Sequence, residues 1–231
     1  MRWNPTGLLP VLAAVLLAAP SSGRADPTWA EVQSIDDWIE HSVRQHDDAG
    51  AVRVLRTTLD EVYCFRAEAT VDLTPKLLLG VALDFEGAIR WSGAGVTEAA
   101  QLSREGLTYD YYQYLDVPDW TLTKDRVWFL RGTVIRDGAA LGLRWERLEQ
   151  GGDHKEIYDD FFARHPKAIE VPVNVGAWMF TPSDDGTEVE YTICSVQGGN
   201  LPIKLGMQVT TTTLPDNVGD LVREARRRAA D

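Results

Sequence analysis

The sequence has little of what metal or nucleophilic chemistry needs. Among 231 residues it has two cysteines and four histidines. His41 and His46 are five residues apart, so they do not share one helical face and do not match the spacing of a zinc pair. His154 and His165 flank an acidic segment around Asp159, which we interpret as a solvated loop rather than a metal site.

The sequence also lacks the motifs of common enzyme classes. It has no nucleophile elbow, P-loop or dinucleotide-binding fingerprint, and the glycines at Gly93 and Gly95 lead into a predicted strand rather than a helix. We therefore expect no catalytic residue, no metal and no cofactor.

Positive charge is scarce. The chain has 23 Lys and Arg against 35 Asp and Glu, which gives a formal net charge of −12. An acidic protein repels phosphate backbones, so we expect no nucleic-acid partner.

No apolar run is long enough to span a membrane. A short run over residues 8–19 follows Arg2, is interrupted by Pro10 and precedes small residues, a pattern typical of a secretory signal peptide. We predict a cleaved signal peptide over residues 1–25 and one domain over residues 26–231, located in the periplasm or secreted. Removal of the signal peptide takes away two arginines and no acid, so the net charge becomes −14.

Segments in which apolar and polar residues alternate dominate the middle of the chain. Tyr109 and Tyr111, for example, alternate with Asp110. Turns of hairpin length, such as Asp137-Gly138, indicate an antiparallel sheet with one apolar face. The predicted strands cover residues 51–57, 61–71, 95–104, 107–117, 125–136, 139–148, 168–181 and 187–197.

Two segments have helical features, one before the first predicted strand and one between the second and the third. Residues 29–46 carry apolar side chains with partly helical spacing, ending at Ile39 and Val43. Thr74-Pro75 is a typical helix start, and the leucines that follow predict a largely buried helix over residues 74–85.

A long amphipathic helix is predicted over residues 202–228. About 27 helical residues at ~1.5 Å each would span ~40 Å, enough to cross a small domain. Pro202 suits a first helical turn, whereas Pro215 should kink or restart the helix. The apolar and small residues at steps of three and four are Ile203, Met207, Thr210, Leu214, Val218, Leu221 and Ala225. This stripe fits either a helix that fills the core of an α+β domain or a helix gripped by a curved sheet with a cavity between them.

Four local sequences resemble those of the StAR-related lipid-transfer (START) family of helix-grip domains. Trp91 follows Asp84-Phe85, as a tryptophan does beyond the family's short helix. Residues 125–131 resemble its Arg-Asp-Phe strand, residues 198–202 resemble the Gly-x-x-Pro start of its last helix, and residues 214–216 resemble the break within that helix. The chain thus resembles an exported bacterial member of this family.

The resemblance implies an α+β helix-grip fold. A curved antiparallel sheet of about nine strands would wrap around the long C-terminal helix and leave a tunnel for one lipid. The resemblance also implies that the second and last predicted strands flank the first, which would place Cys64 and Cys194 two strand spacings, ~9.6 Å, apart. Cα atoms beyond ~7 Å cannot be bridged without backbone movement, so we expect two free thiols.

The family can place an arginine in the tunnel beside an acid, and Arg131 matches the arginine. The acid's position falls on Gln113, so the resemblance implies no charge pair there. We hypothesise that Arg131 and Gln113 meet the polar end of the ligand. The alternative is that Arg131 points outward to solvent.

Five apolar or aromatic side chains are further candidates for the tunnel wall, with ordinary core packing as the alternative. These are Tyr111, Trp91, Trp145, Trp178 and Met207.

We expect a lipid-binding or lipid-transfer protein rather than an enzyme. Its partner would be one lipid or other hydrophobic small molecule (sterol, hopanoid, phospholipid or fatty acid), with transient membrane contact and a monomeric state. Access to the tunnel would require the C-terminal helix, or the loops Ser92–Gly95 and Gln150–Lys155, to move. The alternatives are a cyclase/aromatase-like enzyme on the same fold and a ligand-sensing module.

Overall fold

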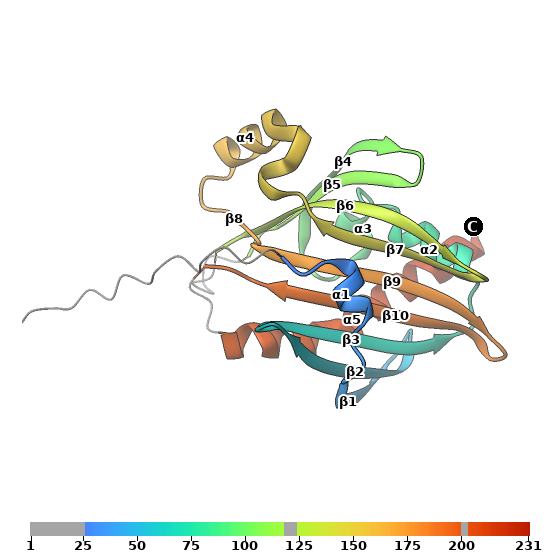
Figure 1. Ribbon diagram of the computed structural model, residues 1–231. Coiled ribbons are helices and arrows are strands. Elements are labelled where there is room, and N and C mark those ends of the chain that lie inside the picture. Colours follow the sequence, from blue (N-terminus) through green and yellow to red (C-terminus); the bar gives the residue numbers. More distant parts are fainter. Residues whose placement is uncertain (1–25, 118–123, 200–202) are drawn as a thin grey trace, which may run out of the picture.

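The computed structural model describes residues 26–117, 124–199 and 203–231, in which one large sheet curves around a long C-terminal helix (Figure 1). The predicted signal peptide lies outside these residues. The strand order is β1-β2-β3-β10-β9-β7-β6-β5-β4, antiparallel throughout, and the short β8 pairs with β6 in parallel.

The strands are β1 (Ile39–His46), β2 (Gly50–Leu59), β3 (Val62–Val71), β4 (Val96–Glu105), β5 (Thr108–Leu115), β6 (Arg126–Asp137), β7 (Ala140–Arg147), β8 (Ile169–Glu170), β9 (Val173–Ser183) and β10 (Gly186–Val196). The helices are α1 (Trp29–Gln33), α2 (Pro75–Ala82), α3 (Ala88–Trp91), the 3-10 segment η2 (Glu149–His154), α4 (Lys155–Arg164) and α5 (Ile203–Ala230). This arrangement confirms the predicted α+β helix-grip class.

Helix α5 lies in the concave face of the sheet, together with α2 (Figure 1). Leu214, Val218, Leu221 and Ala225 are buried against the sheet, as their spacing predicts. The helix continues through Pro215, so the predicted restart does not occur. Helix α2 begins as predicted, because the Thr74 hydroxyl accepts a hydrogen bond from the Leu77 amide.

The β9–β10 hairpin depends on Gly186. Its φ is +128°, and a Cβ at this position would lie 2.4 Å from the carbonyl oxygen of Val71. Only glycine meets both demands without displacing the end of β3.

The partly helical interpretation of residues 29–46 is wrong over most of its length. Only α1 is helical, and residues 39–46 form the edge strand β1, paired with β2. Ile39 and Val43 are four residues apart, a helix-like spacing, but a bulge between Glu40 and Ser42 shifts the strand register, so they pair with Arg56 and Arg53 of β2. Both side chains are exposed.

The two predicted free thiols are also a wrong prediction. Cys64 and Cys194 form a disulfide, with Cα atoms 4.1 Å apart. Strand β3 pairs directly with β10, so the two cysteines are opposite each other across one ladder rather than separated by a third strand. Helix α1 packs over this position through Trp29 and Val32.

Two further segments differ from expectation. The segment interpreted as a solvated loop contains α4, whose Phe161 is fully buried against Tyr112 and Phe129 on the convex face of the sheet. The strand predicted over residues 168–181 is split into β8 and β9 around Pro172, which cannot donate to a strand ladder.

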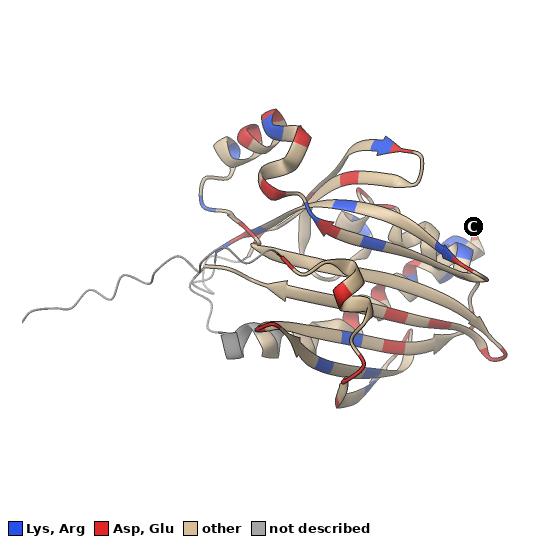
Figure 2. Ribbon diagram, viewed as in Figure 1, with Lys and Arg blue, Asp and Glu red and all other residues tan. Residues whose placement is uncertain are grey.

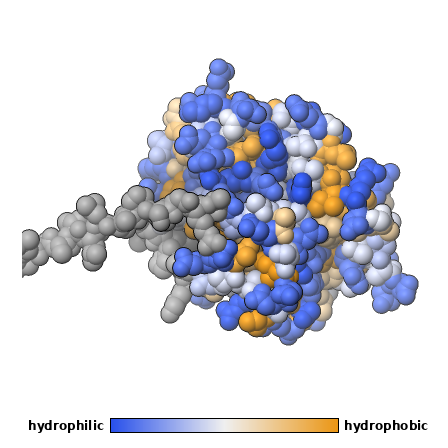
Figure 3. All heavy atoms as spheres, in the orientation of Figure 1, coloured by the Kyte–Doolittle hydropathy of each residue, from blue (hydrophilic) through white to orange (hydrophobic). Residues whose placement is uncertain are grey.

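Acidic and basic residues are interspersed along the sheet and on α4 (Figure 2). The face of the molecule in the same orientation is largely hydrophilic, with separate hydrophobic patches (Figure 3). Of the helices in the described residues, none combines the length and the hydropathy of a membrane span.

Candidate ligand-binding site

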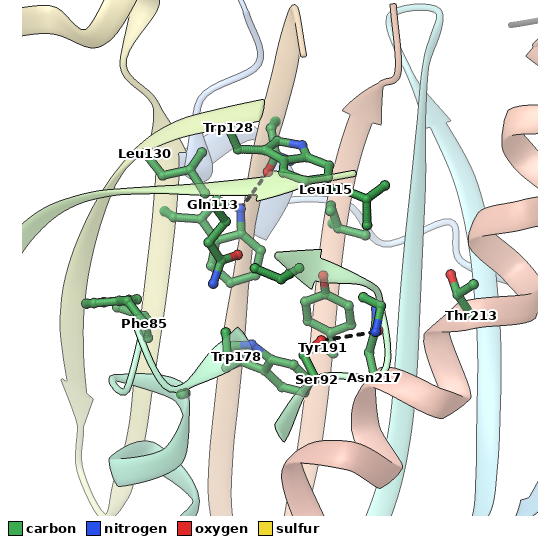
Figure 4. Close-up of a pocket in the computed structure, with 18 of the residues that line it drawn as sticks. Phe85, Ser92, Gln113, Leu115, Trp128, Leu130, Trp178, Tyr191, Thr213 and Asn217 are labelled. Atoms are coloured by element: carbon green, nitrogen blue, oxygen red, sulfur yellow. Dashed lines mark hydrogen bonds between the residues drawn. The ribbon is translucent and has the colours of Figure 1, made fainter. Parts of the chain in front are cut away.

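A cavity of about 290 Å³ lies between the concave face of the sheet and α5 (Figure 4). Its walls come from β4, β5, β6, β7, β9 and β10 on one side and from the middle of α5 on the other. Helix α3 and the loop after it form a further wall through Ala88, Trp91, Ser92 and Ala94. The volume is close to the lower end of the range for small-molecule pockets.

Five of the seven predicted ligand-binding residues line this cavity. They are Trp91, Tyr111, Gln113, Trp145 and Trp178. The alternation of β5 explains two of them, because residues 111 and 113 face inward while Asp110 and Tyr112 face outward. Met207 packs against the core from α5 and is not among the described residues that line the cavity.

Arg131 does not line the cavity, and the outward alternative describes its position. Its guanidinium lies on the convex face and forms two bonds of 2.8 Å with the carboxylate of Asp110, while 45% of the Arg131 side chain is exposed. The Nε2 atom of His154 contacts the same carboxylate at 2.9 Å. Arg131 and, after it, His154 hold the pKa of Asp110 below its usual range. An acid on the preceding strand therefore does pair with Arg131, outside the cavity.

Aromatic stacking fixes the walls of the cavity. Tyr111 stacks on Phe85 with ring centroids 3.8 Å apart, and Tyr191 stacks on Trp178 at 4.1 Å. Burial raises the pKa of both tyrosine hydroxyls above the ordinary range, and the charge interaction with Tyr191 adds to the rise at Tyr111. The cavity is thus a region of low polarity around both hydroxyls.

The polar groups of the cavity walls are uncharged amides, hydroxyls and indoles. Two of these groups are hydrogen-bonded to each other, because the Trp145 indole N–H donates to the side-chain oxygen of Asn174 at 2.7 Å. The Gln113 amide and the Tyr191 hydroxyl are directed toward the cavity (Figure 4). Among the described residues, none forms a hydrogen bond with the side chain of Gln113, Tyr111 or Tyr191.

The loop after α3 is bound to α5 by a buried carboxylate. Asp220, 5% exposed, accepts a hydrogen bond from the Gly93 amide, and Arg223 bonds the same carboxylate. A Cβ at Gly93 would lie 2.8 Å from an Asp220 carboxylate oxygen, so the close approach requires glycine. The other predicted access loop, Gln150–Lys155, lies instead on the convex face, where His154 contacts Asp110, and contributes no cavity wall.

Sequence reasoning missed Asn174, Tyr191 and Asp220. The alternation of β10 contains the signal for Tyr191, which shares a face with Val189 and Ile193. Asp220 looks like one of several polar residues on the solvent face of α5, and nothing in the sequence indicates that a loop from residue 93 covers it.

Similarity to known proteins is visible in structure rather than in sequence. No protein-family model matches the chain, and no curated protein matches it significantly. A STAR-related lipid transfer protein (fragment 25–204) from Xanthomonas axonopodis is 19% identical, with a TM-score of 0.66 over 83% of this chain and 99% of that one. Human StAR-related lipid transfer protein 5 is 12% identical, with a TM-score of 0.69 over 87% and 92% of the two chains.

A solved enzyme structure is also similar in fold, with a lower TM-score than the two lipid transfer proteins. The Zhui aromatase/cyclase from a Streptomyces strain is 14% identical, with a TM-score of 0.50 over 73% of this chain and 96% of that one. The two lipid transfer proteins match more of this chain at higher scores. With its ten-stranded sheet curved around α5, the chain therefore has the START-like helix-grip fold.

Proposed function

We propose that this protein binds one hydrophobic ligand, a lipid, in the cavity between the sheet and α5 and carries it between membranes. The observation that carries this proposal is the cavity itself, whose walls are aromatic and aliphatic side chains with a few uncharged polar groups. Burial of apolar ligand surface at roughly 25 cal/mol per Å² would supply the affinity. The START-like fold, shared with solved proteins named for lipid transfer, supports the same proposal.

Ligand access takes place at the loop Ser92–Gly95 in this proposal. This loop forms part of the cavity wall and is attached to α5 through the buried carboxylate of Asp220, next to the bond from Arg223 to the Trp91 carbonyl. Its displacement would open the cavity while α5 stays packed on the sheet through Leu221 and Ala225.

The proposal places the protein in the periplasm or outside the cell as a monomer that touches membranes transiently. The disulfide between Cys64 and Cys194 supports an oxidising compartment, since such bonds persist mainly in exported proteins. A cyclase/aromatase-like enzyme on the same fold is the second candidate, favoured by the structural similarity to Zhui.

A cavity-blocking substitution tests the proposal. Val96 lines the cavity from β4, and Val96→Trp would fill part of it with an indole. Val43→Trp is the matched control, because Val43 is 55% exposed on the edge strand β1. The proposal predicts that the wild type and Val43→Trp take up a fluorescent long-chain lipid from phosphatidylcholine vesicles and that Val96→Trp does not. Equal uptake by all three proteins would refute binding in this cavity.

A further inference from the structure

The polar groups of the cavity restrict which kind of lipid can bind there. This inference about the ligand's chemical class rests on the proposed function. Gln113, Tyr111 and Tyr191 come from two strands, β5 and β10, on opposite sides of the cavity. Each brings an uncharged hydrogen-bonding group to a space otherwise bounded mostly by hydrocarbon and aromatic rings.

These groups are held in place before any ligand binds. The stack of Tyr111 on Phe85, with planes 15° apart, fixes one ring, and the stack of Tyr191 on Trp178, with planes 18° apart, fixes the other. Tyr111 is 4% exposed, and no described residue hydrogen-bonds its hydroxyl. A hydroxyl that has no protein partner in largely apolar surroundings is unfavourable, and a ligand oxygen or hydroxyl in the cavity would satisfy it.

Among the described residues, no charged side chain lines the cavity. Arg126 shares the inward face of β6 with Trp128, but its guanidinium bonds the backbone carbonyls of Lys124, Gln197 and Gly198. Asp110 on β5 and Arg131 on β6 bond each other on the convex face, where His154 also contacts the aspartate. Among the described residues that line the cavity, a carboxylate or phosphate would therefore meet neutral donors only, in surroundings where burial already disfavours ionised tyrosine. Burial of an unpaired anion is much less favourable than burial of a hydrogen-bonded hydroxyl or carbonyl.

We infer that the cavity selects a lipid whose buried polar group is an uncharged oxygen, a hydroxyl or a carbonyl, bound by Gln113, Tyr111 and Tyr191. An ionised fatty acid or a phospholipid headgroup is disfavoured at the same position. The hydrocarbon part of the ligand then contacts the aromatic and aliphatic walls.

Matched ligand pairs test this inference. Competition binding at pH 8 compares 1-hexadecanol with hexadecanoate, and a sterol with its sulfate ester, so that each pair differs in charge on one skeleton. On at least one skeleton we expect the uncharged member to bind about tenfold or more tightly than the anion. Tyr111→Phe, Tyr191→Phe and Gln113→Leu should each weaken binding of the preferred uncharged ligand about threefold to tenfold, the effect of one hydrogen bond. Their affinity for the parent hydrocarbon should stay unchanged.

The control variant is Arg131→Gln, whose side chain lies on the convex face. It should leave all affinities unchanged. Equal or tighter binding of the anions, or three cavity variants that bind the uncharged ligands as the wild type does, would overturn the inference while lipid binding stands. Absence of binding for every ligand on both skeletons would overturn the proposed function together with it.

Discussion

Cys64 and Cys194 are direct partners across the β3–β10 ladder, and their disulfide joins positions 130 residues apart in the chain. Both side chains are fully buried under α1. A crosslink of this span restricts the unfolded chain strongly, which makes it a main contributor to stability.

The first prediction concerns this disulfide. Intact mass under non-reducing conditions should be two protons below the value for free thiols. Replacement of both cysteines by alanine should lower the free energy of unfolding by about 2–5 kcal/mol, because the unfolded chain regains conformational freedom. Guanidinium denaturation with and without reductant measures the effect. Reductant should destabilise the wild type and leave the double variant unaffected, and identical midpoints for the wild type in both conditions would contradict the prediction.

The second prediction concerns the contact between Asp220 and the loop after α3. Asp220→Ala removes the acceptor for the Gly93 amide, so release of bound lipid should become about threefold to tenfold faster, as expected for the loss of one hydrogen bond. Stopped-flow transfer of a fluorescent lipid to vesicles measures the rate. Asp216→Ala is the matched control, because Asp216 is exposed on the same helix. Equal release rates for the two variants would exclude this loop as the access route.

The third prediction concerns the pair that sequence reasoning placed in the tunnel. Arg131→Ala leaves the buried carboxylate of Asp110 with His154 as its remaining side-chain hydrogen-bond partner. We expect a loss of about 1–2 kcal/mol in the free energy of unfolding, reduced from the value for a fully buried pair because Arg131 is half exposed. Ligand affinity should not change. Urea denaturation and lipid titration of the same samples give both values, and a fall in affinity without a fall in stability would show that Arg131 reaches the ligand after all.

The fourth prediction concerns acid. Arg164 first, then Tyr112 and His165, lower the pKa of Glu98 from 4.5 to about 2. The carboxylate therefore contributes stability above pH 4.5, and this contribution is lost as pH falls from 4.5 toward 2. Because Glu98 and Arg164 are partly exposed, the contribution should be about 1–2 kcal/mol.

Thermal unfolding across pH 6 to pH 2 tests the acid prediction with Glu98→Gln. The variant should be less stable than the wild type at pH 6, and the difference should shrink as the pH falls to 2. If instead the two curves stay parallel over the whole range, Glu98 is not the group that titrates.

Much of the fold could be predicted because alternation and helical spacing are local signals. The C-terminal helix, seven of the long strands and the start of α2 follow from periodicity and from Thr74-Pro75. Residues 39–46 were misassigned because a bulge between Glu40 and Ser42 interrupts the strand alternation, and Ile39 and Val43 keep a helix-like spacing. The disulfide depends on which strands are neighbours, a long-range property that the sequence of β3 or β10 alone does not contain.

The cavity residues also fall into those that local sequence signals predict and those that they do not. Tyr111, Trp145 and Trp178 were predictable because inward and outward positions alternate along a strand once the apolar face is identified. Trp91, on α3, and Gln113 were candidates only through the resemblance to the START family. The direction of Arg131 was left open because both faces of β6 look apolar, and the outer one is covered by α4 through Phe161. The packing of α4 on this outer face could not be predicted while residues 155–164 were interpreted as a loop.

The central claim is that the cavity holds one lipid. Native mass spectrometry of the protein purified from its own source, followed by organic extraction and identification of the extract, tests it most directly. We expect a stoichiometric adduct of one uncharged, oxygen-bearing lipid, absent from Val96→Trp and present in Val43→Trp. A protein that is empty as isolated and takes up no lipid from vesicles would contradict it.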